Sequence, residues 1–130
     1  MIVYDGEIRG IRYWICKNVL EGAKGDGYWV VYVDVSGILK GNGSPIEGAG
    51  DVDDLLSVHE DCTFFDKAER LPGRNVPDDI PGHAVVAGWD YMHGYDLAYP
   101  SDMANLSSRQ TLEEVKEDVR AAIESLAESR

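Results

Sequence analysis

Hydrophobic and polar positions alternate along two stretches in the first third of the chain. In residues 11–17 one face is formed by Ile11, Tyr13 and Ile15, and the other by Arg12, Trp14 and Cys16. In residues 28–35 an uninterrupted apolar face is formed by Trp29, Val31, Val33 and Val35. A period of two residues with β-branched and aromatic side chains is typical of β-strands. The glycine-rich segment between the two stretches predicts a hairpin with a wide loop.

Two further strands are predicted at residues 55–65 and 83–91, where the strand-like pattern returns. The segments that separate these strands from each other and from their neighbours are rich in glycine, proline and polar residues, which is typical of loops. The predicted loops are 36–54, 66–81 and 95–109.

Residues 111–128 carry the clearest helical pattern. Thr111 is followed three residues later by Glu114, a capping box that marks the start of a helix. Apolar residues then recur at spacings of three and four and form one stripe, while the opposite face is charged. The stripe is formed by Leu112, Val115, Val119, Ile123 and Leu126.

These elements predict a single α+β domain that spans residues 1–130. The domain consists of a largely antiparallel sheet of four to five strands, with a C-terminal amphipathic helix packed on one face. The apolar face of residues 28–35 is the natural place for the helix. A chain of 130 residues is long enough to bury a core without disulfides or metals.

The net charge of −12 excludes some partners and favours others. A chain this acidic, with no visible basic patch, is not expected to bind nucleic acid directly, and it complements a partner with a basic surface. Solubility, or a salt-adapted host, also explains such a charge and is the commoner reason for it. No apolar run approaches the roughly 20 residues of a membrane span, and the N-terminus lacks the pattern of a signal peptide, so we expect a cytoplasmic protein. Cys16 and Cys62 are expected to be buried thiols.

Polar residues gather near the ends of the strands at 55–65 and 83–91. They are His59, Thr63, Asp90, His93 and Asp96. Two imidazoles with carboxylates suit a divalent metal, which could activate water, or a pocket for a nucleotide. The alternative is a structural network in which Asp90 caps loop amides and His93 bonds a neighbouring carboxylate. We favour the network because the histidines lack a recognisable ligand spacing, and we expect no cofactor and no catalytic set.

An aromatic rim is predicted where the strand at 83–91 passes into the next loop. Tyr91, Tyr95 and Tyr99 lie close to Met92 and Met103 in the sequence, and exposed tyrosine and methionine side chains are common in protein interfaces. The alternative is that these residues cover the sheet edge.

Several of these segments, in the same order, resemble the motifs of a widespread, mostly uncharacterised family of small proteins of tailed phages. That family has a Gly-Tyr-Val-type strand, a Val-His-Gly-Gly-x-Thr-Tyr motif, a Gly-Phe-Asp-Cys-x-His-x-x-Asp motif and a helix that opens with Arg-x-Leu-x-x-Val. The matching residues are Gly27 to Val33, Val58-His59 with Thr63-Phe64, Gly88-Trp89-Asp90 with His93 and Asp96, and Arg109 to Val115. Glu60-Asp61 stands in place of the glycine pair, and Tyr91 in place of the cysteine.

The resemblance implies a phage or mobile-element origin and a role during infection, inside the host cell. Together with the charge and the missing catalytic set, it leads to the hypothesis of a stoichiometric binder that inhibits a host antiviral defence component, in the manner of an anti-CRISPR protein. A second hypothesis is a pocket that binds a nucleotide signal or hydrolyses it with a metal, built on His59, Asp90, His93 and Asp96. A third is an accessory role in the virion or in host takeover.

Overall fold

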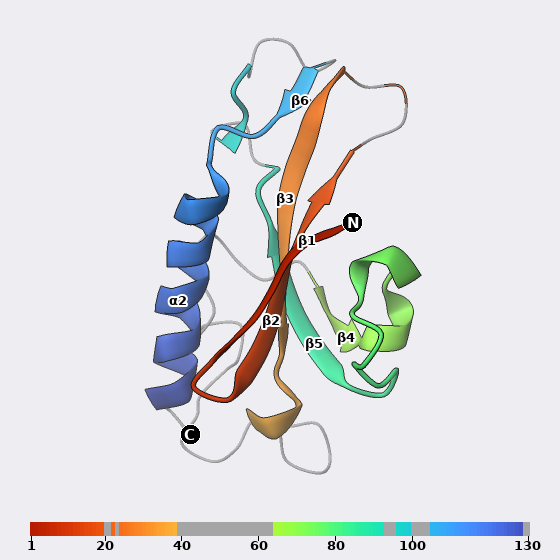
Figure 1. Cartoon of the computed structure of the whole chain (residues 1–130), viewed down its shortest axis with the longest axis vertical. Helices are drawn as coiled ribbons and strands as arrows, with labels where there is room; N and C mark the ends of the chain where they lie inside the picture. Colours follow the sequence, from red (N-terminus) through yellow and green to blue (C-terminus); the bar gives the residue numbers. More distant parts are fainter. Residues whose placement is uncertain (20–21, 23, 39–63, 93–95, 100–104, 129–130) are drawn as a thin grey trace.

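The computed structural model describes residues 1–19, 22, 24–38, 64–92, 96–99 and 105–128 (Figure 1). The strands are β1 (Ile2–Ile8), β2 (Ile11–Asn18), β3 (Lys24–Asp34), β4 (Phe64–Lys67), β5 (Val85–Asp90) and β6 (Asn105–Ser107). The α-helix is α2 (Leu112–Glu128), and the 3₁₀ turns are η1 (Ser36–Ile38), η2 (Ala68–Arg70) and η3 (Gly73–Asn75). Five strands form an antiparallel sheet in the order β1-β2-β3-β5-β4, and β6 pairs with β3 in parallel. The α+β prediction is confirmed.

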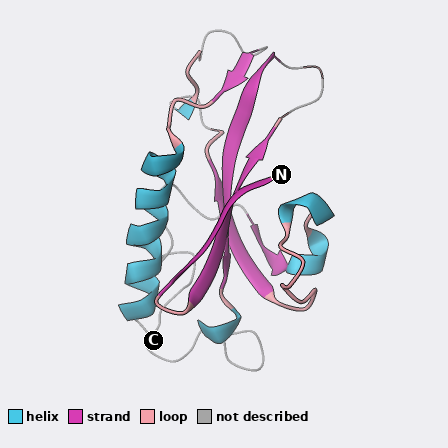
Figure 2. Ribbon diagram, viewed as in Figure 1, coloured by secondary structure: helices cyan, strands magenta, loops and turns pink. Residues whose placement is uncertain are grey.

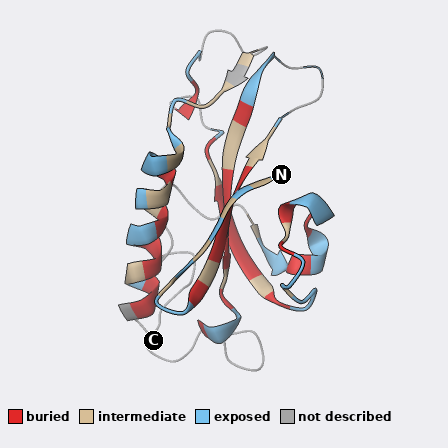
Figure 3. Ribbon diagram, in the orientation of Figure 1, coloured by how far each residue is buried: buried red, intermediate tan, exposed pale blue. Residues whose placement is uncertain are grey.

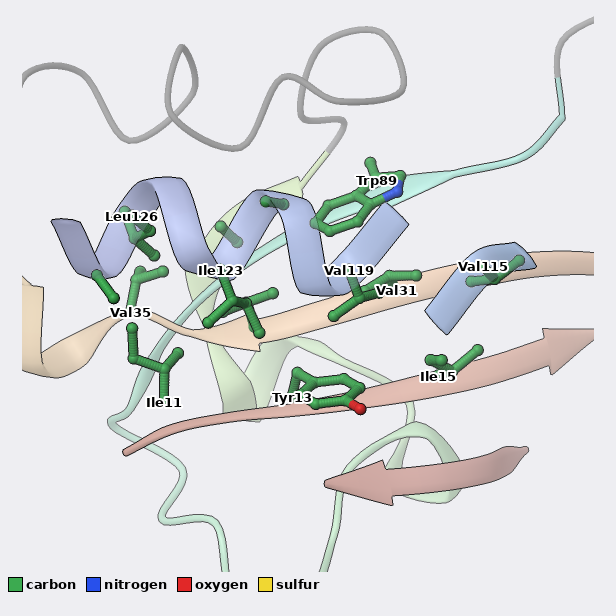
Figure 4. Close-up of a cluster of buried hydrophobic side chains, with 14 of the residues drawn as sticks. Ile11, Tyr13, Ile15, Val31, Val35, Trp89, Val115, Val119, Ile123 and Leu126 are labelled. Atoms are coloured by element: carbon green, nitrogen blue, oxygen red, sulfur yellow. The ribbon is translucent and has the colours of Figure 1, made fainter. Parts of the chain in front are cut away.

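The helix lies along one face of the sheet (Figure 2). Its apolar stripe packs on the inward side chains of β2 and β3 and on Val35, which follows β3 (Figure 4). Val31, Val33 and Val35 are completely buried. The buried side of α2 faces the sheet and its exposed side faces outward (Figure 3). Both bonds of the predicted capping box are formed, because the Glu114 amide donates to Thr111 Oγ1 at 3.2 Å and the Thr111 amide donates to Glu114 Oε1 at 3.0 Å.

The other face of the sheet is also buried, which the sequence pattern did not predict. Trp14, Cys16, Val30 and Tyr32 pack there against side chains from residues 68–86. The loop prediction for 66–81 was therefore wrong in part, since β4 continues to Lys67 and the turns η2 and η3 cover this second core. Turns this short leave no periodic pattern to detect. Burial raises the pKa of the Cys16 thiol to about 11, and the expected burial of this cysteine is confirmed.

Two strands, β1 and β6, were also missing from the prediction. β1 is interrupted by polar and glycine residues at positions 5 to 7, and its side chains alternate between half-buried and exposed. It is held by a two-residue turn, Arg9-Gly10, whose φ angles of 53° and 81° match a tight hairpin turn. The strand β6, inside the segment expected to be irregular, covers only three residues.

Gly88 shows how closely β3, β4 and β5 pack. It lies between Tyr32 of β3 and Phe64 of β4 in the sheet register. A Cβ atom at this position would lie 2.7 Å from Tyr32 Cδ1 and 2.8 Å from the Val31 carbonyl oxygen. With no side chain there, the rings of Tyr32 and Phe64 meet in a T-shaped arrangement, with centroids 5.9 Å apart.

We expect Gly88→Ala to lower the free energy of unfolding by about 1 to 3 kcal/mol, the usual cost of overpacking a core. Urea unfolding followed by tryptophan fluorescence measures the change. Gly73→Ala is the matched control, because a Cβ at Gly73 meets no atom within 4 Å, and its effect should stay within about 0.5 kcal/mol. Equal stability of the two variants would contradict this account of Gly88.

Candidate functional site

The predicted site region begins where β5 ends beside the start of α2. The β3–β5 ladder continues for one residue beyond Asp90, since the Tyr91 amide donates to the Trp29 carbonyl at 2.9 Å. Of the predicted site residues, the structure describes Asp90, Tyr91, Asp96 and Tyr99. The others, His59, Thr63, His93 and Tyr95, lie outside the described residues.

Tyr91 is completely buried, so its prediction as an exposed rim residue was wrong. Its hydroxyl donates to Asp118 Oδ2 at 2.7 Å and accepts a bond from Trp89 Nε1 at 3.3 Å. Burial raises the pKa of Tyr91 well above its usual range, and the hydrogen bond to the Asp118 carboxylate adds to this shift. The phenol is therefore a permanent donor that fastens α2 to the sheet. The period of the strand carried the signal for this burial, since it places Tyr91 on the same face as Ala87 and Trp89, which lie in the core under α2.

Asp96 is also completely buried, and it ties the loop after β5 to the residues before α2. Its Oδ1 accepts a bond from Gln110 Nε2 at 2.7 Å, and its backbone carbonyl accepts one from the Arg109 amide at 2.8 Å. The Gln110 carbonyl in turn accepts a bond from Trp29 Nε1 at 2.9 Å. Gln110, which the sequence reasoning missed, connects Asp96 to β3.

Asp90 lies on the other side of the sheet from Asp96. It is paired with Val30, and side chains of paired residues project from the same face, which is here the face opposite α2. Its Oδ1 accepts a bond from the Met92 amide at 3.3 Å, so it caps a loop amide as the structural interpretation expected. The structure thus does not bring the Asp90 and Asp96 carboxylates together. The closeness of the two residues in sequence suggested that their side chains meet, but Asp96 lies beyond the end of β5 and bonds Gln110 and Arg109 instead.

The described residues offer little to a metal or a nucleotide. Within the described ranges, no group of three or more His, Cys, Asp or Glu side chains is placed to hold a metal ion. Two cavities that these residues line have volumes of about 180 Å³ and about 120 Å³. Ligand pockets usually span roughly 300 to 1,000 Å³, so neither of the two suits a nucleotide.

The exposed part of the rim is smaller than predicted. Of its described members, Tyr99 is 54% exposed and Met92 is 38% exposed. Both flank the bonded loop that contains Asp96, and Ala98 beside Tyr99 donates its amide to the Ser107 carbonyl at 2.8 Å. Tyr99 is therefore an exposed aromatic side chain on a backbone anchored to β6.

Comparison of the chain with protein-family models, with curated proteins and with solved structures finds no match. The resemblance to the phage family therefore stays a prediction. No helix formed by the described residues is long and apolar enough to cross a membrane.

We expect Tyr91→Phe to lower the free energy of unfolding by about 1.5 to 3 kcal/mol, the range for a hydrogen bond to a charged group. Urea unfolding at neutral pH measures the loss. Tyr99→Phe also removes one phenolic hydroxyl, but from an exposed ring, so its effect should stay within about 0.5 kcal/mol. If Tyr91→Phe is as stable as the unaltered protein, the hydroxyl does not fasten the helix.

Proposed function

We propose that the protein acts by binding a partner with a basic surface in a fixed ratio, as an inhibitor of a host antiviral defence component. Its place of action would be the cytoplasm of the host cell during infection. The observation that carries the proposal is the charge, a net −12 on 130 residues. Complementary charge speeds the encounter of two proteins and selects among partners.

The described surface supports this proposal. Ten acidic side chains are exposed there against seven basic ones. The acidic ones are Asp5, Glu7, Asp26, Asp66, Glu69, Asp78, Asp79, Glu113, Glu114 and Glu117. A further excess lies in the sequence between residues 39 and 63, where six residues are acidic and one is basic.

The use of the buried polar groups also favours binding over catalysis. Tyr91 and Asp96 are completely buried and form hydrogen bonds within the fold, as does the half-buried Asp90. Groups held this way fix loops and helices, whereas a reacting group must reach its substrate. Among the described residues, the exposed surface is therefore better suited to contact a partner than any pocket is.

The proposal is tested by mixing the purified protein with RNA-guided defence complexes and with other nucleic-acid-binding defence proteins. We expect one of them to co-elute with the protein in a fixed ratio on size exclusion and to lose its activity. The affinity should fall as salt rises, because screening weakens attraction between exposed charges. A panel in which no complex forms and every defence activity survives would refute the proposal.

Within such a complex, we expect Tyr99→Ala to weaken binding by about tenfold or more, since exposed tyrosines often dominate interfaces. Calorimetric titration against the identified partner measures the change. The matched control is Phe65→Ala on the edge strand β4, where the ring is 51% exposed compared with 54% for Tyr99. Equal losses in the two variants would show that Tyr99 makes no specific contribution to the contact.

A further inference from the structure

β1 forms one edge of the sheet. The strand order ends there, and among the residues that the structure describes no strand pairs with the outer side of β1. Such an edge presents unpaired backbone groups to which another extended chain can pair.

The hairpin turn determines which backbone groups face outward. In a two-residue hairpin the residues that flank the turn, here Ile8 and Ile11, exchange hydrogen bonds with each other. Hydrogen-bonded and non-hydrogen-bonded pairs then alternate along an antiparallel ladder. Glu7 opposite Arg12 and Asp5 opposite Trp14 are therefore non-hydrogen-bonded pairs, and both acidic residues direct their N–H and C=O groups away from β2.

The two charged side chains of β1, Asp5 and Glu7, are both acidic. Arg12 lies between two carboxylates and donates to both oxygens of Asp5, at 2.8 and 2.7 Å, and to both of Asp79, at 2.6 and 3.1 Å. These bonds to Arg12 lower the pKa of Asp79, so that carboxylate stays ionised. Glu7 is also exposed, so the carboxylates of Asp5, Glu7 and Asp79 lie near a single guanidinium, that of Arg12.

This charge selects the kind of strand that could be added. If two copies of β1 paired antiparallel through Asp5 and Glu7, carboxylates would lie opposite carboxylates, and like charges placed directly opposite are destabilising. An extended segment with lysine or arginine at alternate positions would instead place its cations opposite Asp5 and Glu7 on the same face.

We propose that the outer edge of β1 receives an extended basic segment of the partner as an added strand. The inference rests on the proposed function and specifies the surface and the form of the contact. The backbone of Asp5 and Glu7 supplies the hydrogen bonds, and their carboxylates select alternating basic side chains.

The probe is a short synthetic peptide in which lysine alternates with threonine and valine. It is titrated against the ¹⁵N-labelled protein and followed by amide shifts and hydrogen exchange. We expect the shifts to centre on Asp5 and Glu7 and exchange at their amides to slow. A peptide with glutamate in place of lysine should not bind. A lysine peptide that is N-methylated on its ladder-facing amides keeps the charge but loses its donors, so it should bind about tenfold more weakly or worse.

Variants of the protein provide the second arm. Glu7→Gln and Glu7→Lys should weaken peptide binding progressively, the latter by about tenfold. Glu117→Lys makes the same charge change as Glu7→Lys on the exposed face of α2, and it should leave the affinity within about twofold. Urea unfolding checks that every variant is folded. If Glu7→Lys does not fold, Glu7→Gln still provides the test.

The inference is overturned if the N-methylated peptide binds as tightly as its parent, if the shifts centre elsewhere, or if no peptide binds. In the last case the charges of β1 serve only to prevent self-association. If Glu7→Lys binds the partner as tightly as the unaltered protein does, β1 is not the contact surface, but the proposed function still holds. If the peptide binds at β1 but no defence component forms a complex, the proposed function is refuted and the inference that β1 accepts a basic strand still holds.

Discussion

The structure depends on one constraint, which is that β3 must be covered on both faces. Its side chains alternate between two cores, with Val31 and Val33 under α2 and Val30 and Tyr32 under the segment from η2 to β5. A strand with both faces apolar cannot lie at a surface, because either exposed face would leave large apolar groups in water. The helix and the turns η2 and η3 therefore lie on opposite sides of the sheet, and β2 and β5 flank β3.

The sequence predicted the helix side of this arrangement correctly, because long elements with clear periods carry their own signal. The alternation from Ile11 to Cys16, the stripe of α2 and its capping box all appear as expected. The second core was missed because its cover consists of two 3₁₀ turns and isolated residues such as Leu71 and Ala84. Their burial is decided by tertiary packing, which no local period records.

The candidate site was predicted less well than the fold, for a physical reason. Residues near the end of a strand and in the following loop are adjacent in sequence, but the sheet separates those that project to opposite faces. Asp90 projects with Val30, whereas Asp96 lies with Gln110 and Trp29 near the start of α2. Tyr91 was expected to be exposed because it opens a stretch rich in tyrosine and methionine, as protein interfaces are, yet its hydroxyl bonds Asp118, which lies 27 residues further along the chain.

Of the polar groups that suggested chemistry, the described pair, Asp90 and Asp96, instead forms hydrogen bonds that fix the chain after β5 and before α2, and Tyr91 fastens α2. This shifts the search for function to the outside of the sheet. The helix anchored by Tyr91 and the loop anchored by Asp96 keep one face of β3 covered. Among the described residues, the open parts of the sheet include the outer backbone of the edge strand β1 and the charged side chains around it. At β1 the same residues, Asp5 and Glu7, provide both the outward amides and the negative charge. An edge of this kind disfavours pairing with a second copy of β1 and favours pairing with a basic strand. One feature therefore supplies both solubility and selectivity.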